Sequence, residues 1–187
     1  MKHPSSLIVF GGLPGTGKTT IARELTARLA ATYLRIDAIE QPLRDAGFIV
    51  GAAGYAVANT LAAENLKLGR IVIADCVNPV LASRAGWRQT TLRTGAGIVE
   101  IEVICSEPAL HRQRVENRLP DIDGHRVPTW DDVVSLTYEP WDREHLVLDT
   151  AESSLDHVLD GVEAHVRTRS ASRLTGVCWD ETPRTRI

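Results

Sequence analysis

A glycine-rich segment between a short apolar run and a helix-like stretch constrains this chain more than any other feature. Residues 12–19 read GLPGTGKT and match the pattern G-x-x-x-x-G-K-[ST] at every fixed position. The apolar run Leu7–Phe10 precedes it, and an amphipathic stretch starts near Thr19. A turn of this kind points several backbone N–H groups at one anion, with the positive end of a helix dipole behind them. The segment therefore predicts a loop that binds the phosphates of a nucleoside triphosphate.

The side chains of this loop have separate predicted roles. Lys18 can reach the β- and γ-phosphates, and the hydroxyl of Thr19 can ligate Mg²⁺, so ATP and Mg²⁺ are the predicted cofactors. The predicted phosphate-binding residues are Gly12, Pro14, Gly15, Thr16, Gly17, Lys18, Thr19 and Thr20. The alternative is a strand-to-helix turn with an incidental lysine, which would need neither this register nor these flanks.

Composition narrows the class of protein. The length of 187 residues suffices for one domain with a hydrophobic core, and a net charge of −3 does not favour a nucleic-acid partner. The N-terminal apolar run is too short for a signal peptide or a membrane span, so we expect a cytoplasmic protein with no membrane partner. Cys76, Cys105 and Cys178 are odd in number and widely spaced, which favours reduced thiols. The expected oligomeric state is a monomer or a homodimer.

Short strand-like runs alternate with longer helical patterns. The predicted strands are Leu7–Phe10, Thr32–Ile36, Ile71–Ala74, Ile98–Cys105 and His145–Leu148. Helical patterns follow at Thr19–Leu29, 38–69 with interruptions at Gly51 and Gly54, Leu81–Thr94, Glu107–Arg118, and Ser153–Arg169, where Ser153 is the predicted cap. This alternation predicts an α/β fold with a parallel sheet covered on both faces.

The chain reads as a single domain over residues 1–169. A polar stretch with two prolines and a glycine, within about 119–130, is the predicted lid. The tail 170–187 is polar and arginine-bearing, and it is expected to be partly disordered or docked on the surface.

Acidic residues follow three of the predicted strands. Asp37, Asp75 and Asp149 should lie near the phosphate loop, because ligands bind at the carboxyl ends of parallel strands. Asp37 is the predicted base for a substrate hydroxyl, and the alternative role is a helix N-cap. Asp75 is the predicted Mg²⁺-orienting acid, and the alternative is a turn residue. Asn78, before a proline, fits either a site or a turn.

Two arginines precede the predicted lid. Arg114 and Arg118 are four residues apart, which would place both on one face of a helix, where they could clamp phosphate. The alternative is a solvated basic face. Arg44, Tyr55 and Asn59 are the polar groups that could wall an acceptor pocket, although none is predicted to be catalytic.

Together these motifs resemble the small P-loop kinases, a grouping that includes chloramphenicol phosphotransferase, gluconate kinase and the zeta-toxin kinases. The resemblance spans residues 7–166 and rests on the phosphate loop, the acid after the second strand, and three further motifs. These are Asp75-x-x-Asn78, Arg114-x-x-x-Arg118, and Tyr138-Glu-Pro140 before a strand that ends Leu-Asp-Thr150.

The resemblance implies a five-stranded sheet of order 2-3-1-4-5 in a three-layer fold. It also implies that Asp37 acts as the base, that Arg114 and Arg118 border the lid, and that the turn holding Thr150 lies beside the adenine. One departure is the lid, which carries mixed charge rather than many arginines.

The resulting functional expectation is an ATP-dependent phosphotransferase acting on a hydroxyl of a small molecule, with Lys18, Asp37, Arg114 and Arg118 as catalytic residues. An ATPase or switch protein, with water as the acceptor, is one alternative. A zeta-toxin-like kinase of a nucleotide sugar is another. A kinase of nucleic-acid ends is disfavoured by the net charge.

Overall fold

The computed structural model describes the backbone of residues 5–175 and 185–186, and the side chains of residues 5–168. The strands are β1 (Ser6–Gly11), β2 (Thr32–Arg35), β3 (Ile71–Asp75), β4 (Gly97–Ile104), β5 (Leu146–Asp149) and β6 (Thr185–Arg186). The helices are α1 (Lys18–Leu29), α2 (Ile36–Asp45), α3 (Ala53–Lys67), α4 (Leu81–Thr94), α5 (Pro108–Glu116), α6 (Trp130–Ser135) and α7 (Leu155–Thr175).

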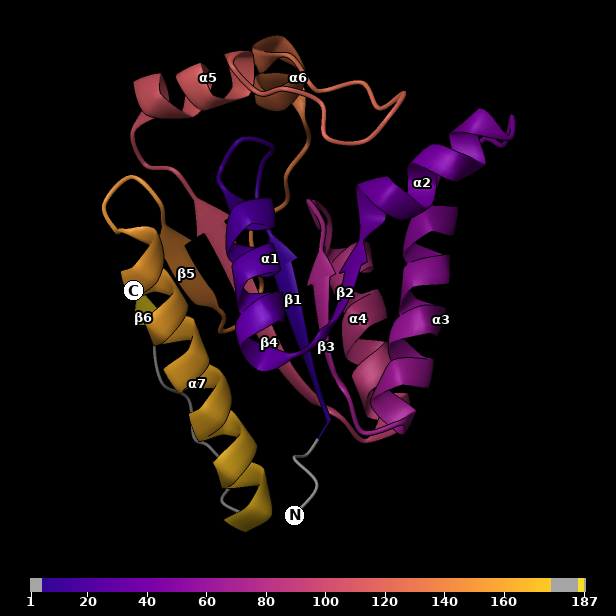
Figure 1. Ribbon diagram of the computed structural model, residues 1–187, viewed down its shortest axis with the longest axis vertical. Helices are drawn as coiled ribbons and strands as arrows, with labels where there is room; N and C mark the ends of the chain where they lie inside the picture. Colours follow the sequence, from indigo (N-terminus) through magenta and orange to yellow (C-terminus); the bar gives the residue numbers. More distant parts are fainter. Residues whose placement is uncertain (1–4, 176–184, 187) are drawn as a thin grey trace.

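The strands form one parallel sheet in the order β2-β3-β1-β4-β5-β6 (Figure 1). The predicted order 2-3-1-4-5 is confirmed for the first five strands. The two-residue strand β6 extends the sheet beyond β5 and comes from the segment predicted as a tail. The rest of the tail after Thr175 lies outside the described residues.

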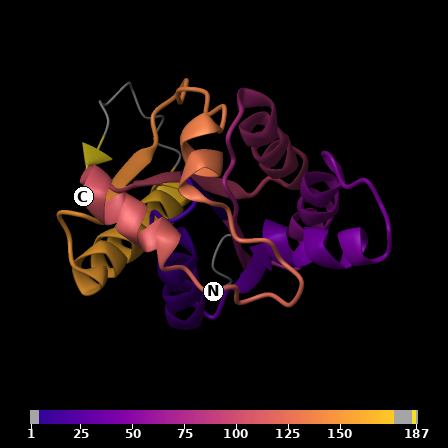
Figure 2. The ribbon, with the colours of Figure 1, turned by 90° about the horizontal axis from the view of Figure 1, so that it is seen from above.

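Alternation of apolar residues along β1 builds a core on each face of the sheet. Ile8 and Phe10 pack with α1 and α7, whereas Leu7 and Val9 pack with α3 and α4. Seen from above, α1 and α7 lie on one side of the sheet and α4 on the other (Figure 2). This arrangement is the predicted three-layer fold, and it leaves the carboxyl ends of the strands free at one edge.

The ends of β2 and β3 lie side by side, with Arg35 in register with Asp75. The chain turns into α2 at Ile36, because β3 ends there and β2 has no further partner to hydrogen-bond. The predicted strand Thr32–Ile36 is therefore one residue too long. Asp37 lies in the first turn of α2 rather than at the end of a strand.

The helical pattern predicted over residues 38–69 is two helices. A loop that contains Gly47 and Gly51, both at positive φ, separates α2 from α3. Gly54 does not interrupt a helix but lies inside α3, where a Cβ would approach the side chain of Glu40 to 2.4 Å. The glycine therefore allows α3 to pack closely on α2.

Helices α5, α6 and α7 differ from the sequence prediction, and α7 runs on to Thr175, past its predicted end at Arg169. The helix α5 stops at Glu116, with Asn117 as its C-cap, so it does not reach Arg118. The N–H of His157 bonds to the hydroxyl of Ser154, so Ser154 rather than Ser153 caps α7. The short helix α6 is absent from the prediction, although Thr129 and Asp132 form a capping box at its start.

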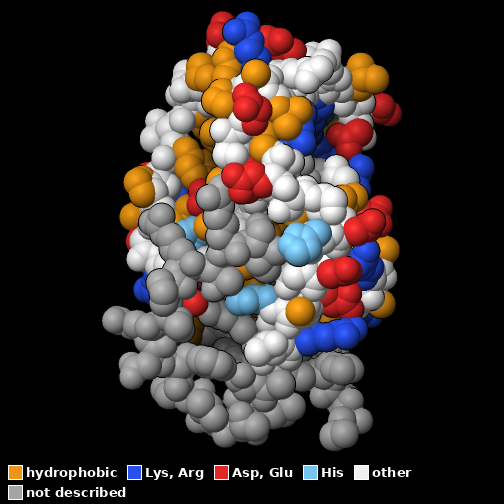
Figure 3. Space-filling model, turned by 90° about the vertical axis from the view of Figure 1, so that its left-hand side faces the viewer, with side chains coloured by type: hydrophobic (Ala, Val, Ile, Leu, Met, Phe, Trp, Pro, Cys, Tyr) orange, Lys and Arg blue, Asp and Glu red, His pale blue; other side chains and the backbone are white. Residues whose placement is uncertain are grey.

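The segment 117–129 joins α5 to α6 and passes above the carboxyl edge of the sheet (Figures 1 and 2). It contains the predicted lid, about 119–130, except for Trp130, which begins α6. On the face shown in Figure 3, acidic and basic side chains are mixed rather than gathered by sign.

Cys76 and Cys105 are free thiols, and Cys178 lies outside the described residues. Among the described helices, none is both long and apolar enough to cross a membrane.

Candidate nucleotide-binding site

The loop between β1 and α1 depends on three glycines at positive φ. Gly12, Gly15 and Gly17 have φ of 131°, 84° and 93°. A Cβ on Gly12 would lie 2.2 Å from the carbonyl oxygen of Val103, and one on Gly15 would lie 2.4 Å from a methyl group of Val115. Only glycine fits this conformation and spacing. The loop therefore brings its backbone close to β4 and α5.

The first turn of α1 presents backbone N–H groups at the end of this loop. Gly17 is the N-cap and has no side chain with which to bond them. Unpaired N–H groups at a helix N-terminus, together with the helix dipole, favour a bound anion. Thr19 and Thr20 lie in this turn, so their hydroxyls stand beside the place where phosphates would bind.

Lys18 is buried within the curl of the loop. Its amine donates a hydrogen bond to the carbonyl oxygen of Leu13 at 2.6 Å and lies 3.4 Å from the hydroxyl of Thr16. Burial lowers the pKa of Lys18 to about 8, against the opposing effect of nearby Asp75, Cys76 and Asp37. A phosphate would supply the negative charge that this amine lacks, which favours triphosphate binding here.

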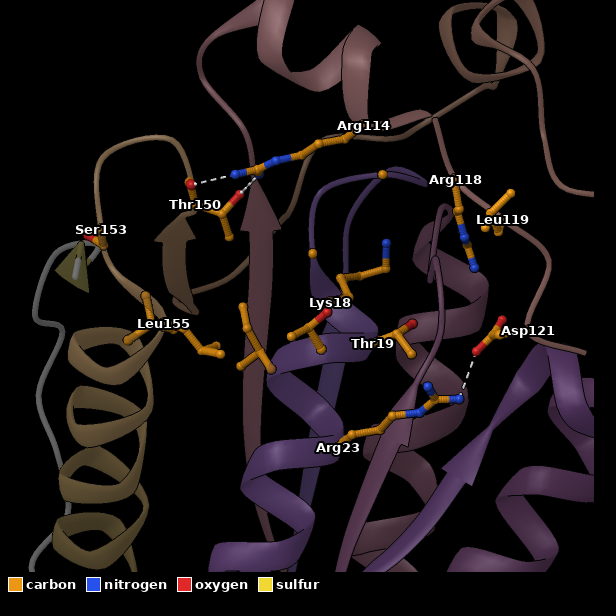
Figure 4. A pocket seen from close by; sticks show the side chains of 15 residues that line it. Lys18, Thr19, Arg23, Arg114, Arg118, Leu119, Asp121, Thr150, Ser153 and Leu155 are labelled. Atoms are coloured by element: carbon orange, nitrogen blue, oxygen red, sulfur yellow. Dashed lines mark hydrogen bonds and ion pairs between the residues drawn. The ribbon is translucent and has the colours of Figure 1, made fainter. Parts of the chain in front are cut away.

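A cavity of about 540 Å³ opens beside the loop (Figure 4). It is bordered by the loop and α1 on one side, by α5 and the lid above, and by the start of α7 opposite. The predicted site residues that line it are Gly15, Gly17, Lys18, Thr19, Thr20, Arg114, Arg118 and Thr150. Its size is in the range of small-molecule sites.

Gly12, Pro14 and Thr16 shape the loop without lining the cavity. The N–H of Gly12 bonds to the carbonyl oxygen of Val77 at 3.0 Å. The carbonyl oxygen of Pro14 lies 2.8 Å from Nε2 of His111, which fixes the loop against α5. The hydroxyl of Thr16 donates to the carbonyl oxygen of Leu13 at 2.9 Å. These three predicted phosphate-binding residues thus act on the loop's conformation in this structure.

The residues present fit Mg²⁺ as the accompanying ion. Asp75 is buried at the end of β3 and accepts a hydrogen bond from the hydroxyl of Tyr33 at 2.6 Å, which leaves its other oxygen for a ligand or water. It is close enough to raise the pKa of Lys18. Mg²⁺ takes oxygen ligands and keeps several waters and phosphate oxygens. Among the described residues there is no group of three or more His, Cys, Asp or Glu side chains that could hold a metal ion.

Arg114 and Thr150 form one side of the cavity. The guanidinium of Arg114 donates to the hydroxyl of Thr150 at 2.7 Å and to its carbonyl oxygen at 3.1 Å. The Thr150 hydroxyl in turn lies 3.0 Å from the carbonyl oxygen of Thr16 and 3.2 Å from that of Ile104. Thr150 therefore connects α5 and the end of β5 to the phosphate loop.

Arg118 lies apart from Arg114. Because α5 ends at Glu116, the two arginines do not share a helix face, which corrects the expectation from their spacing. The Arg118 side chain points down into the cavity near Lys18 and Thr19, whereas Arg114 extends toward Thr150 (Figure 4). Arg118 is also close enough to lower the pKa of Lys18. Of the two, Arg118 is the arginine that points toward Lys18.

Asp37 does not line this cavity but lies in the first turn of α2, which follows directly after β2. Its carboxylate lies 3.4 Å from a guanidinium nitrogen of Arg35, and it acts electrostatically on Lys18. Its side chain is 36% exposed, so solvent or a substrate can reach it. The structure thus places an accessible carboxylate near the phosphate-binding lysine.

The sequence reasoning missed an ion-pair cluster between the lid and the sheet. Asp121 of the lid accepts from Arg35 at 2.6 Å and 3.0 Å, and from Arg23 of α1 at 2.7 Å. Arg23 and Asp121 line the cavity. Arg35 is visible in the sequence as a basic residue two positions before Asp37. No sequence pattern indicates that it contacts Asp121, which is 86 positions away.

The polar groups predicted to wall an acceptor pocket have structural partners instead. Asn59 bonds to Thr90 at 2.6 Å, and the Tyr55 hydroxyl accepts from the backbone N–H of Asn78 at 2.9 Å. Arg44 pairs with Glu40 at 2.5 Å on the same helix. Asn78 is fully buried at φ 55°, so the turn interpretation fits its backbone, and its side-chain amide has no partner among the described residues.

A second missed residue holds the Tyr138-Glu-Pro140 motif in place. Arg84 is fully buried and donates to the carbonyl oxygens of Glu139 at 2.6 Å and Pro140 at 2.9 Å. Its guanidinium also lies 4.5 Å from the ring centre of Trp141 and 5.3 Å from that of Tyr138. The sequence gives no clear signal for Arg84, because a buried arginine in a helix has the same local pattern as an arginine on the helix surface.

The sequence profile of a protein family described as "AAA domain" matches residues 7–130 of this chain, from β1 to the start of α6. The chain belongs to the AAA domain family. The matched part contains the phosphate loop, Asp37, Asp75 and both arginines, so the whole phosphate-binding side of the site lies within the family domain.

Several curated proteins are similar to this AAA domain. An uncharacterised protein of Mycobacterium tuberculosis (strain ATCC 25618 / H37Rv) is 32% identical over 109 residues, which are 50% of this chain and 22% of that protein. The chain thus spans about a fifth of the first relatives it matches. A protein of Aeropyrum pernix named "Probable adenylyl-sulfate kinase" is 28% identical over 165 residues, covering 78% of this chain and 84% of that one.

Solved structures share the fold of the AAA domain. A gluconokinase from Sinorhizobium meliloti 1021 superposes with a TM-score of 0.65 at 18% identity, covering 95% of this chain and 100% of the other. The Mycobacterium tuberculosis APS kinase in complex with AMPPNP and APS gives 0.67 at 19% identity, covering 88% and 98%. The fold expected from the resemblance to P-loop kinases is therefore confirmed.

Proposed function

We propose that this AAA domain is an ATP-dependent phosphotransferase that moves the γ-phosphate of ATP to a hydroxyl group of a small molecule. The observation that carries the proposal is the position of Asp37, an accessible carboxylate within electrostatic reach of Lys18. A nucleotide-binding loop alone serves motors, switches and kinases alike. A carboxylate beside the phosphate side of the loop adds a group that can accept a proton from an attacking hydroxyl.

The residues have distinct roles in this reaction. In this proposal the loop N–H groups and Lys18 hold the β- and γ-phosphates. Arg118, which lines the cavity and points toward Lys18, would face the transferring group. Thr19 and Asp75 would hold Mg²⁺, which supplies charge neutralisation when bound. The acceptor oxygen forms a bond to the γ-phosphorus as its proton passes to the Asp37 carboxylate. The bond between that phosphorus and the β–γ bridging oxygen breaks, and ADP leaves.

The relatives agree with a small-molecule acceptor. The solved structures of the same fold include proteins named gluconokinase and APS kinase, and a curated relative carries the name of an adenylyl-sulfate kinase. The names of the two solved structures do not transfer, because their identities to this chain are 18% and 19%. The curated relative is 28% identical, which does not establish its acceptor for this chain. The mixed charge around α2 and the lid does not favour one of these acceptors over another.

The test is a panel of sugars, nucleosides, nucleotide sugars, antibiotics and amino alcohols, scored by acceptor-stimulated ADP release and by mass detection of the phosphorylated product. We expect at least one class to accelerate ADP release. Steady hydrolysis with a flat response across the panel would contradict the proposal and favour an ATPase. Phosphorylation of a nucleotide sugar would identify the zeta-toxin-like alternative.

The role of Asp37 is tested with the best acceptor from that panel. Removing a general base costs about 10²–10⁴-fold in rate, so Asp37→Asn should lose transfer by that factor while retaining its affinity for ATP. Asp45→Asn, at the other end of α2, is the matched control and should keep its activity. Near-normal transfer by Asp37→Asn would remove Asp37 from the role of base.

A further inference from the structure

The lid is attached to the sheet by an ion pair with two hydrogen bonds. Both oxygens of Asp121 accept from Arg35, at 2.6 Å and 3.0 Å, and the Arg35 side chain is only 3% exposed. Bidentate pairs of this kind are among the stronger polar contacts in proteins. The Arg35 guanidinium holds the pKa of Asp121 well below its usual range, so this acid is charged at neutral pH.

Two further contacts hold the lid down. Arg23 of α1 also donates to Asp121, at 2.7 Å. At the tip of the lid, Gly124 lies against α2, where a Cβ would approach the side-chain nitrogen of Gln41 to 3.1 Å. The lid in this structure therefore rests on α1, β2 and α2 at once, which is a closed position over the site.

Arg35 also touches the proposed base. The guanidinium nitrogen that bonds to Asp121 at 3.0 Å lies 3.4 Å from an oxygen of Asp37. Its Nε atom is buried and has no partner among the described residues. One arginine therefore lies between a lid carboxylate, which it holds tightly, and the base, which it contacts only loosely.

Opening the lid would leave Arg35 as a buried cation without its main partner. A buried cation that loses its partner destabilises the protein strongly, so another carboxylate within reach should take the place of Asp121. Asp37 is already 3.4 Å away and needs only a small side-chain shift. Asp37 also acts electrostatically on Lys18 of α1 and on Glu40 of its own helix.

We propose that Arg35 exchanges carboxylate partners with the position of the lid, pairing with Asp121 when the lid is closed and with Asp37 when it is open. This inference rests on the proposed function. A carboxylate that accepts two hydrogen bonds from a guanidinium is a poorer proton acceptor than one that is loosely contacted. Asp37 is thus available as the base only under the closed lid, which limits hydrolysis of ATP by water before an acceptor is enclosed. Arg35 is a positioning residue in this scheme.

A structural test needs no activity. In a crystal structure of Asp121→Asn, we expect Arg35 to bond to Asp37 through two nitrogens at ordinary hydrogen-bond distances. Asp123→Asn changes the same residue type two positions along the lid and is the control, which should keep the Arg35–Asp121 pair. An Asp121→Asn structure in which Arg35 stays away from Asp37 would overturn the proposal.

A kinetic test asks whether a second substitution, at Arg35, raises or lowers the kcat of Asp121→Asn. Asp121→Asn should lower kcat for transfer about tenfold, because the base is occupied. Adding Arg35→Gln removes the competing cation and should raise kcat again by about threefold or more, whereas adding Arg35→Lys should not. A purely structural pair predicts that the double variants are no faster than Asp121→Asn.

The outcomes separate this proposal from the proposed function. If the wild-type protein transfers phosphate to no acceptor, the proposed function fails, yet the Asp121→Asn structure still decides the partner exchange. If transfer occurs and neither the shift of Arg35 nor the kinetic recovery is found, only the partner exchange fails. Thermal unfolding of each variant, with ATP affinity, checks that the folds are comparable.

Discussion

The hydroxyl of Thr150 donates a hydrogen bond to the carbonyl oxygen of Thr16 across 3.0 Å, which joins the end of β5 to the phosphate loop. The same hydroxyl accepts from Arg114 at 2.7 Å. The conformation of the loop thus depends on a residue that lies 134 positions away from it in the chain.

Thr150→Val should weaken nucleotide binding while leaving the fold intact. The substitution keeps the size of the side chain but removes the hydroxyl that links Arg114 to the loop. Losing such a bond typically costs about 1–1.5 kcal/mol, which is roughly a tenfold rise in the Kd for ADP. Thr150→Ser retains the hydroxyl and should bind normally. Equal affinities for the valine and serine variants would contradict this role.

Gly15→Ala should be more damaging than the same change at Gly47. Both glycines are at positive φ, 84° and 83°, where an L-residue costs about 1–2 kcal/mol. A Cβ at Gly15 would lie 2.4 Å from Val115, whereas nothing lies within 4 Å of one at Gly47. Calorimetry should show loss of ADP binding only for Gly15→Ala, and urea unfolding should show the larger destabilisation there. Comparable effects at both positions would refute the packing argument.

Nucleotide binding should take up a proton at alkaline pH. Burial lowers the pKa of Lys18 to about 8, so at pH 9 this amine is mostly neutral in the free protein. The phosphates restore the charged form, and we expect uptake of about one proton per nucleotide. Titration calorimetry in buffers of different ionisation enthalpy measures this number. Lys18→Met should show no uptake if Lys18 is its source.

The lowered pKa of Lys18 also predicts how the free energy of unfolding changes with pH. Between about pH 8 and the unfolded value of 10.5, the unfolded chain binds more protons at Lys18 than the folded chain does. This group therefore favours the folded state increasingly as pH rises through that window. The free energy of unfolding of the wild type, relative to that of Lys18→Met, should therefore increase as the pH is raised from about 8 to 10.5.

Substitutions of Arg114 and Arg118 should affect different kinetic parameters. Arg114 contacts Thr150, so Arg114→Ala should raise the Kd for nucleotide by about tenfold with a smaller effect on kcat. Arg118 faces the phosphate side, so Arg118→Ala should lower kcat by about 10²-fold or more. Arg112→Ala, which removes an exposed pair with Glu116, is the control. The reverse assignment of the two effects would show that the roles are exchanged.

Arg84→Met should destabilise the fold without a direct effect on the nucleotide. The buried guanidinium satisfies carbonyl oxygens of Glu139 and Pro140 and packs against Trp141. Removing it leaves polar groups without a partner, and we expect a loss of about 3–5 kcal/mol in the free energy of unfolding. Arg112→Met, at an exposed position, should lose far less. A small effect at Arg84 would mean that water replaces its hydrogen bonds.

Much of the fold could be predicted because its signals are local. The phosphate loop, the five longer strands and the helices between them each leave a pattern within about ten residues, and parallel topology orders their carboxyl ends at one edge. The prediction missed the short helix α6 and the two-residue strand β6, and it misplaced some element boundaries. The ends of β2 and α5 moved by one or two residues, and these shifts placed Asp37 in a helix and separated Arg114 from Arg118. The end of β2 is set by the loss of its partner strand β3, which is not a local property of the sequence.

The sequence by itself determined that this chain folds as a P-loop protein and binds phosphate, because glycine spacing and a single lysine encode that loop directly. Tertiary structure alone decided which groups surround it. Only folding brings Asp121 to Arg35, Thr150 to Thr16, and Arg118 toward Lys18. Electrostatic and hydrogen-bond energies fall steeply with distance, so residues far apart in the chain acquire a role only once the fold places them within a few ångströms.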